Sequence, residues 1–247
     1  MPINVMMVEA PLSIPESRPL RVVGDVHGDV SAFAYATDTD RFLIQLGDLV
    51  DYGPDSAGVL RRMFDLIDQG RGLFLLGNHD LKLARFLLGQ KVRSNAELIA
   101  TRKQMDDALR ERFLAEVARA PLWLQDGPRL FIHAGFHTDM LLGPSPQMEI
   151  GRAVGVNARA LFGEPTGMTQ MDGFPERSLR WVHRIPPGVT VYVGHDRRSQ
   201  DGRPLEQWSR AGGRAIFLDT GAGKGGHLSW IDLPPLESDM RVPASFR

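Results

Sequence analysis

The feature that most constrains the fold is a set of six short apolar runs, each followed directly by small or polar residues. These runs occupy residues 21–23, 42–46, 73–76, 130–132, 189–193 and 215–218. Runs this short and this apolar are typical of strands that are buried on both faces of a sheet. Because helical patterns lie between several of the runs, the chain is predicted to be an α/β protein with a largely parallel sheet.

Three segments between the runs have helical patterns. Residues 55–69 repeat apolar side chains along one stripe, and Gly70 follows as a stop signal. Residues 81–88 and 95–120 are also predicted to be helical, and the second of them is rich in Arg, Glu, Ala and Leu. Residues 143–174 are rich in Gly and Pro with weak periodicity, so this stretch is predicted to be mostly loop with one short helix.

Near the end of the chain, residues 214–219 and 227–233 are predicted to pair as a β-hairpin through a Gly-rich turn. The turn, Gly221–Gly226, has the glycine content of a nucleotide-binding P-loop. It does not fit the P-loop pattern, because Leu218 stands at the position of the first glycine and Gly225 replaces the serine or threonine. We therefore interpret it as a turn and expect no kinase or ATPase activity.

Composition excludes several classes of function. A chain of 247 residues with 43% hydrophobic residues is long enough to bury a substantial core. Its net charge of −1 argues against a surface dedicated to DNA or RNA, so no stable nucleic-acid binding is expected. The chain has no cysteine, which excludes disulfides, thiolate zinc sites, iron–sulfur clusters and cysteine nucleophiles. Any bound metal must therefore use His, Asp, Glu or Asn ligands, a set that suits Mn²⁺, Fe, Zn²⁺ or Mg²⁺.

The N-terminal stretch shows no targeting pattern. Residues 1–20 have no cationic segment followed by an apolar one and contain four prolines, so they are predicted to be a loose leader rather than a signal peptide. No apolar run approaches the length of a membrane span. We therefore expect a cytoplasmic protein without membrane partners, and a flexible tail over residues 234–247.

Aspartate, asparagine and histidine residues follow the apolar runs, so the predicted sheet brings them to one edge. These residues are Asp25, His27, Asp48, Asp51, Asn78, His79, His133 and His195. Each one alone has an ordinary structural explanation, such as a turn aspartate or an asparagine N-cap. Several carboxylates buried together are costly unless a cation neutralises them. The whole set therefore predicts a metal site at this edge.

Five short motifs occur in an order that resembles the phosphoprotein-phosphatase branch of the calcineurin-like metallophosphoesterases. They are Gly24–Gly28, Gly47–Asp51, Gly77–Asp80, His133–Gly135 and Gly194–His195. The resemblance covers residues 20–233 and implies an α/β (α+β-type) fold with a central β-sandwich flanked by helices. It also implies one domain over residues 1–247, in which residues 95–120 form a helical insertion and residues 234–247 a tail.

The resemblance also implies a role for each polar residue of the set. The ligands implied for a first metal are Asp25, His27 and Asp48. Those implied for a second metal are Asp48, which would bridge the two ions, with Asn78, His133 and His195. The implied cofactors are two divalent ions, Mn²⁺ or else Fe, Zn²⁺ or Ni²⁺. A hydroxide between the metals would attack phosphorus in line, and His79, oriented by Asp51, would protonate the leaving oxygen.

Position 52 departs from the family pattern. The family usually has an arginine directly after the aspartate that Asp51 matches, where it grips the substrate phosphate, but this chain has Tyr52. Arginine offers a charged planar fork and tyrosine one neutral hydroxyl, so phosphate binding is expected to be weaker or to be supplied from elsewhere. The candidate substrate-binding residues are Tyr52, Arg177 and Arg180, because the family often places a second phosphate-binding arginine in the region of the latter two.

Residues 47–88 are similar to bacterial branches of the family, especially the phosphatase module of polynucleotide kinase-phosphatases and the diadenosine tetraphosphatases. The resemblance implies a phosphatase acting on phosphomonoesters, with nucleotides, RNA ends or other phosphorylated small molecules as partners. One alternative is a bacterial Ser/Thr or Tyr protein phosphatase that acts on phosphoproteins. Another is a metal-binding regulatory module with weakened catalysis. Tyr52 favours this last alternative, whereas His79 and Asp51, which no metal site needs, argue against it.

Overall fold

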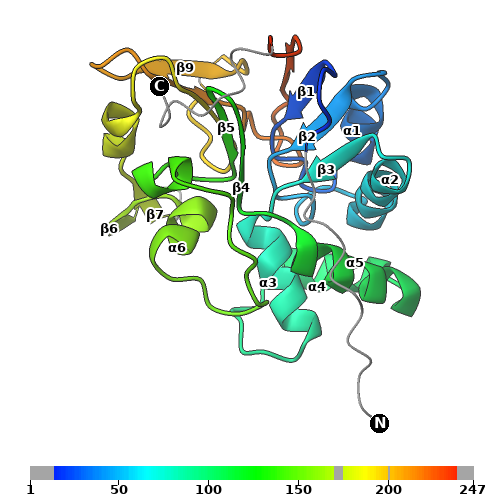
Figure 1. The fold of residues 1–247 in the computed structure, drawn as a ribbon. Coiled ribbons are helices and arrows are strands. Elements are labelled where there is room, and N and C mark those ends of the chain that lie inside the picture. The colour runs from blue at the N-terminus through cyan, green and yellow to red at the C-terminus, as the bar shows by residue number, and fades with distance from the viewer. Residues whose placement is uncertain (1–13, 170–174, 200, 238–247) are drawn as a thin grey trace.

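The computed structural model describes residues 14–169, 175–199 and 201–237, and it contains two main β-sheets with helices around them (Figure 1). The first sheet, in the order β11-β1-β2-β3, consists of β1 (Leu20–Val23), β2 (Phe42–Gln45), β3 (Gly72–Phe74) and β11 (Trp230–Leu233). The second, in the order β4-β5-β8-β10-β9, consists of β4 (Trp123–Asp126), β5 (Arg129–Ile132), β8 (Thr190–Val193), β9 (Leu205–Trp208) and β10 (Arg214–Phe217). The short strands β6 (Pro165–Thr169) and β7 (Pro175–Arg177) pair with each other.

The helices cover the outer sides of the sheets. They are α1 (Val30–Ala36), α2 (Ser56–Asp68), α3 (Asn78–Leu87), α4 (Ala96–Gln104), α5 (Asp107–Arg119) and α6 (Gly155–Phe162), with 3₁₀ turns at η1 (Thr138–Leu141) and η2 (Arg180–Arg184). In Figure 1, α1 and α2 lie beside the first sheet, and α3, α4 and α5 lie together at one end of the molecule. The apolar stripe predicted for residues 55–69 is confirmed, since Val59, Leu60 and Met63 of α2 are fully buried.

Two layers of apolar side chains hold the sheets and helices together. Between the sheets, Val22 and Ile44 of the first sheet pack in one cluster with Phe131, Tyr192 and Ile216 of the second. A larger cluster joins the other faces of the strands to the helices. Both faces of the central strands are therefore buried, as their apolar sequences predict. The α/β fold with a central β-sandwich flanked by helices is confirmed.

The expectation of one largely parallel sheet is wrong. β1, β2 and β3 are parallel neighbours, but β11 pairs antiparallel with β1, and β4 and β9 are antiparallel edge strands of the second sheet. Apolar runs buried on both faces occur in a sandwich as well as in a single covered sheet. The pattern of these runs therefore could not distinguish the two arrangements.

The predicted C-terminal hairpin is also wrong. β10 pairs with β8 and β9 in the second sheet, whereas β11 pairs with β1 in the first. The Gly-rich segment between them thus crosses from one layer of the sandwich to the other. It leaves the second sheet at Leu218, whose N–H still donates to the Val193 carbonyl oxygen at 2.7 Å.

The helical segment 95–120 consists of two helices rather than one. Met105 is extended after α4, and the Asp106 side chain then accepts a hydrogen bond of 2.8 Å from the Leu109 N–H to start α5. A new N-cap satisfies the free donors of a helix start, which makes the break favourable. The short helix predicted within residues 143–174 is present as α6.

No helix within the described ranges is both long and apolar enough to cross a membrane. The predicted leader and tail lie mostly outside the described residues.

Candidate metal centre

The predicted ligands follow strands of both sheets and meet at one end of the sandwich. Asp25 and His27 follow β1, Asp48 follows β2, Asn78 starts α3 after β3, His133 follows β5 and His195 follows β8. A hydrogen bond joins the two sheets here, because the backbone N–H of His195 donates to the side-chain Oδ1 of Asp25 at 2.9 Å. Residues from both layers of the sandwich therefore build one site.

The first group of possible metal ligands comprises Asp25, His27 and Asp48, whose ligand atoms all lie within 4.8 Å of one another. Nδ1 of His27 lies 2.9 Å from the Val50 carbonyl oxygen, so it carries the proton and donates it there. Nε2 of His27 then faces Asp25 Oδ2 at 3.8 Å and Asp48 Oδ2 at 3.7 Å. This nitrogen is buried without a hydrogen-bond partner among the described residues, as expected of a metal ligand.

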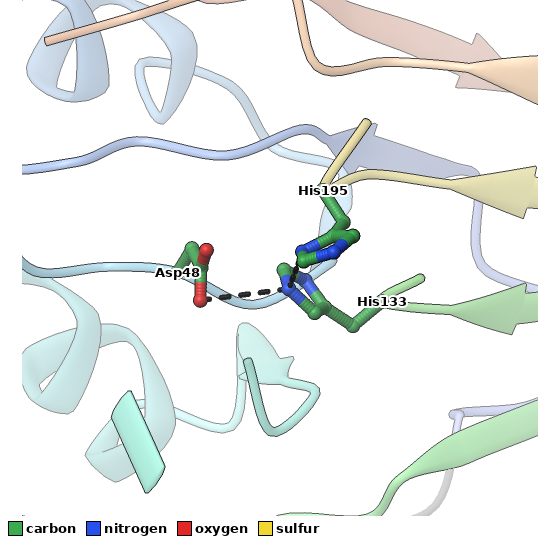
Figure 2. Close-up of side chains that lie close together, drawn as sticks. All are labelled: Asp48, His133 and His195. Carbon is green, nitrogen blue, oxygen red and sulfur yellow. Dashed lines mark hydrogen bonds and ion pairs between the residues drawn. The ribbon is translucent and has the colours of Figure 1, made fainter. Parts of the chain in front are cut away.

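The second group comprises Asp48, His133 and His195, again with ligand atoms within 4.8 Å of one another. Figure 2 shows the two imidazoles turned toward each other and toward the Asp48 carboxylate. Nδ1 of His133 lies 2.8 Å from the Leu46 carbonyl oxygen, which leaves Nε2 as the free lone pair. That Nε2 lies 3.0 Å from Asn78 Oδ1 and 3.1 Å from His195 Nδ1. Its distance to Asp48 Oδ1 is 3.5 Å.

The electrostatics of the site fit two bound cations. Burial lowers the pKa values of His27, His133 and His195, which keeps the rings neutral and able to bind a metal. Burial, followed by the charges of Asp219 and Asp48, raises the pKa of Asp25 well above its ordinary value. Burial alone would raise the pKa of Asp48, but positive charge at the surrounding positions lowers it below its ordinary value, so this carboxylate is ionised. Asp48 belongs to both groups of possible ligands.

A histidine outside the ligand groups is held by a buried carboxylate. Nδ1 of His79 lies 2.7 Å from Asp51 Oδ2, and the hydroxyl of Thr101 donates to Asp51 Oδ1 at 2.8 Å. Asp51 is fully buried, so its geometry is fixed. Burial lowers the pKa of His79, but the Asp48 charge and the contact with Asp51 outweigh burial and leave this pKa above its ordinary value. The arrangement leaves Nε2 of His79 to carry the proton that can be transferred.

The backbone of the site adopts an unfavourable conformation at several residues. Among the described residues, positive φ angles occur at six non-glycine positions, and five of these lie in the site. They are His27 (46°), Asp48 (60°), Asp51 (73°), Tyr52 (65°) and His195 (63°). Each such residue costs roughly 1–2 kcal/mol relative to right-handed backbone. Strain concentrated in this way is typical of functional sites, where the geometry is kept for its chemistry.

Asp80 was not among the site residues predicted from the sequence, although it positions Asp48. Oδ2 of Asp80 accepts from the Asp48 N–H at 2.8 Å and from the Gly77 N–H at 3.2 Å, and Oδ1 accepts from the Leu49 N–H at 3.0 Å. Asp80 follows His79 directly in the sequence, so it could have been found as an acidic residue in the first turn of α3. Thr101, by contrast, reaches Asp51 from α4, and no local pattern indicates that contact.

We expect the substitution Asp80→Asn to weaken Mn²⁺ binding by roughly 10- to 100-fold, a typical effect of losing a residue that orients a metal ligand. The amide has one acceptor oxygen in place of two, so the backbone N–H groups of Asp48 and Leu49 cannot both keep their bonds. Calorimetric titration of the metal-free protein with Mn²⁺ measures the change. A dissociation constant equal to that of the wild type would contradict the role given to Asp80.

The three candidate substrate-binding residues lie in different surroundings. Tyr52 is half-buried beside the metal centre, with its ring centroid 5.0 Å from that of His27. Burial, followed by the Asp51 charge, raises the pKa of Tyr52 to about 12, so the phenol is neutral. Arg177 is half-buried and donates to the Phe162 carbonyl oxygen at 3.1 Å.

The guanidinium of Arg177 also influences the second ligand group. Burial, followed by the charges of His133 and Arg177, lowers the pKa of His195 well below its ordinary value. Arg180 is exposed at the start of η2, and no contact found within the described ranges joins it to the metal centre. The structure therefore brings Tyr52 and Arg177 toward the site and leaves Arg180 apart.

Loading with metal is expected to raise the melting temperature. Bound cations compensate the buried carboxylates of the folded chain, and the unfolded chain offers no such site. At a Mn²⁺ concentration of 100 times the dissociation constant, one site adds about 2.7 kcal/mol. For a chain of this length that corresponds to roughly 5–10 °C. Thermal denaturation with Mn²⁺ and with a chelator tests this, and equal melting temperatures would contradict metal binding.

Known proteins are similar to this chain in both sequence and fold. Residues 18–156 match the calcineurin-like phosphoesterase family. The asymmetrical bis(5′-nucleosyl)-tetraphosphatase PrpE of a Geobacillus species is 31% identical over 91% of this chain and 94% of its own length. The PrpE protein of Anoxybacillus flavithermus is 29% identical over the same shares of the two chains.

Solved structures show the same fold at lower sequence identity. A protein assigned by inference as a diadenosine tetraphosphatase has a TM-score of 0.58 at 23% identity, over 90% of this chain and 96% of that one. A protein serine/threonine phosphatase of Saccharomyces cerevisiae has a TM-score of 0.59 at 13% identity, over 90% of this chain and 81% of that one. At these identities the likeness concerns the fold alone.

Proposed function

The chain belongs to the calcineurin-like phosphoesterase family and is a hydrolase of phosphate esters, and from that premise we propose that it is a two-metal enzyme acting on nucleotides. The observation that carries the proposal is the sharing of Asp48 between two groups of three ligands, with His79 held by Asp51 beside them. We further propose that the preferred substrates are dinucleoside tetraphosphates. The support for this class is the likeness, over nearly the whole chain, to proteins named asymmetrical bis(5′-nucleosyl)-tetraphosphatases.

The proposed metal ligands are Asp25, His27, Asp48, Asn78, His133 and His195. Two divalent ions held by these residues would neutralise phosphoryl charge and activate a water for in-line attack on phosphorus. Imidazole and carboxylate ligands without thiolate suit Mn²⁺, with Fe, Zn²⁺ or Ni²⁺ as other candidates. Asp48 would set the spacing of the two ions, because one of its oxygens faces each ligand group.

The residues beside the metal ligands would handle the proton of the reaction. Asp51 fixes the ring of His79 through Nδ1, so the proposed general acid is the Nε2–H of His79. It would protonate the oxygen of the departing nucleotide as the bond to phosphorus breaks. Thr101 keeps Asp51 in place from α4, which supports a role in catalysis for the helical segment that was predicted to be an insertion.

A substrate panel tests this proposal. The Mn²⁺-loaded protein is offered diadenosine tetraphosphate, a 2′,3′-cyclic nucleotide, p-nitrophenyl phosphate and a phosphoserine peptide, and the products are separated by chromatography. Asymmetric cleavage predicts equal amounts of ATP and AMP and the highest kcat/KM for the dinucleotide. A higher kcat/KM for the phosphopeptide would contradict the nucleotide assignment and support a protein phosphatase.

A further inference from the structure

The Gly-rich loop 221–226, which the sequence analysis interpreted as a plain turn, forms part of the wall of the metal centre. Gly223 has a φ of +69°, and a Cβ atom added there would lie 2.3 Å from the His27 carbonyl oxygen and 3.2 Å from the Gly53 nitrogen. Only glycine permits so close an approach at this φ. The loop is closed on itself by the Gly226 N–H, which donates to the Gly221 carbonyl oxygen at 2.8 Å. Its position beside the first ligand group is thus fixed.

This loop places a cation against Tyr52. Nζ of Lys224 lies 4.5 Å from the centroid of the Tyr52 ring, within the range of a cation–π interaction. The same ring contacts both site imidazoles on this side, with centroid distances of 5.0 Å to His27 and 5.3 Å to His79. The ammonium, the phenol ring and the imidazoles are therefore neighbours in space, although Lys224 is far from the other residues in the sequence.

The ammonium of Lys224 is also accessible from solvent. Lys224 is exposed, so its ammonium can meet a ligand from solvent while it lies over the Tyr52 ring. Lys224 therefore places a positive charge on the His27 side of the site.

We propose that Lys224, held in place by the face of Tyr52, is a substrate-binding residue that contacts a phosphate group of the nucleotide substrate. The inference rests on the proposed function and adds to it the residue that supplies positive charge on the His27 side. An ammonium on a four-carbon stem can leave the ring to donate hydrogen bonds to phosphate oxygens. Tyr52 acts as a positioning residue, because its ring keeps the Lys224 ammonium beside the site without adding a charge of its own.

Arg177 is less suited to this contact. Its guanidinium donates to the carbonyl oxygens of Phe162 and Pro175 at 3.1 and 3.2 Å, and its charge acts on His195 in the other ligand group. Lys224 and Arg177 thus lie toward different ligand groups of the same site. A substrate with several phosphates has anionic groups for both, whereas a single phosphate needs only one.

The role of Lys224 itself is tested with three variants of the Mn²⁺-loaded full chain. Lys224→Met removes the charge, Lys224→Arg keeps it, and Lys91→Met removes the charge of an exposed lysine beyond the far end of α3. The binding of inorganic phosphate is measured by calorimetry, and KM and kcat are measured with diadenosine tetraphosphate. Metal content is determined for every variant, so that a damaged metal centre is recognised.

Lys224→Met is expected to weaken phosphate binding and raise KM by about tenfold, as loss of a charged hydrogen bond does, with kcat changed by less than about threefold. Lys224→Arg and Lys91→Met are expected to stay within about threefold of the wild type in both quantities. Tyr52→Leu is expected to weaken phosphate binding as well. The double variant Lys224→Met/Tyr52→Leu should bind phosphate no more weakly than Lys224→Met alone, because the two residues act as a unit.

Unchanged phosphate affinity in Lys224→Met with two metals bound would overturn the role of Lys224. Additive losses in the double variant would overturn the role of Tyr52 in positioning the lysine. Inorganic phosphate contains no nucleoside, so this measurement does not depend on the substrate. Failure of the wild type to cleave diadenosine tetraphosphate would therefore contradict the proposed function. The phosphate-binding measurement would still test the role of Lys224.

Discussion

Asp48→Asn is expected to lower kcat/KM for p-nitrophenyl phosphate by roughly 10²–10⁴-fold, the equivalent of about 3–5 kcal/mol for removing one partner of a buried charge arrangement. Asp48 is the residue that both ligand groups share, and its two oxygens face different histidines. Asparagine keeps the size of the side chain but has one acceptor oxygen and no charge. The variant should therefore lose the close pairing of two cations as well as activity.

The matched control for this variant is Asp106→Asn. Asp106 caps α5 far from the metal ligands in the sequence, and asparagine caps a helix about as well as aspartate does. Elemental analysis after desalting measures the bound metal, and circular dichroism confirms that each variant is folded. If Asp48→Asn retained two metals per chain with full activity, the bridging position of Asp48 would be incorrect.

His79→Gln is expected to lower kcat for phenyl phosphate by roughly 10²–10⁴-fold, which is the usual contribution of a general acid. Glutamine keeps polar contacts with Asp51 but cannot transfer a proton. The loss should be smaller for p-nitrophenyl phosphate, because nitrophenolate is a more stable leaving group and needs protonation less. Metal content should remain at the wild-type value, because His79 belongs to neither ligand group.

The comparison of the two esters separates acid catalysis from a general loss of structure. His183→Gln, which replaces an exposed histidine in η2, serves as the control and should leave both rates unchanged. An equal loss for both esters in His79→Gln would mean that His79 positions the substrate rather than protonating the leaving group. No loss for either ester would contradict any role of His79 in the reaction.

The positions of the candidate ligands could be predicted from the sequence because each is local to a strand end. Glycine followed by Asp, Asn or His marks where an apolar run stops, whereas the division of these residues into two ligand groups is implied by the resemblance of the five motifs to a known family. The prediction of His27 and Asp48, for example, required only that the ends of β1 and β2 be recognised. The structure places these residues within reach of each other, as the motif order implied.

Contacts between distant segments could not be predicted in this way. The sequences of segments 214–219 and 227–233 are compatible with a hairpin, and only the packing of Ile216 and Leu233 between two sheets selects different layers. That crossing carries Lys224 to Tyr52, and α4 carries Thr101 to Asp51. Such contacts depend on tertiary packing, which leaves no periodic pattern in the sequence.

The most direct test of the two-metal account is a titration of the chelator-treated, desalted protein with Mn²⁺, with hydrolysis of p-nitrophenyl phosphate followed at each addition. The account predicts no turnover without metal, a steep rise between one and two equivalents and a plateau at two per chain. A plateau at one equivalent would mean that Asp48 does not join two metal sites. Turnover that is independent of Mn²⁺ after complete removal of metal would contradict the account as a whole.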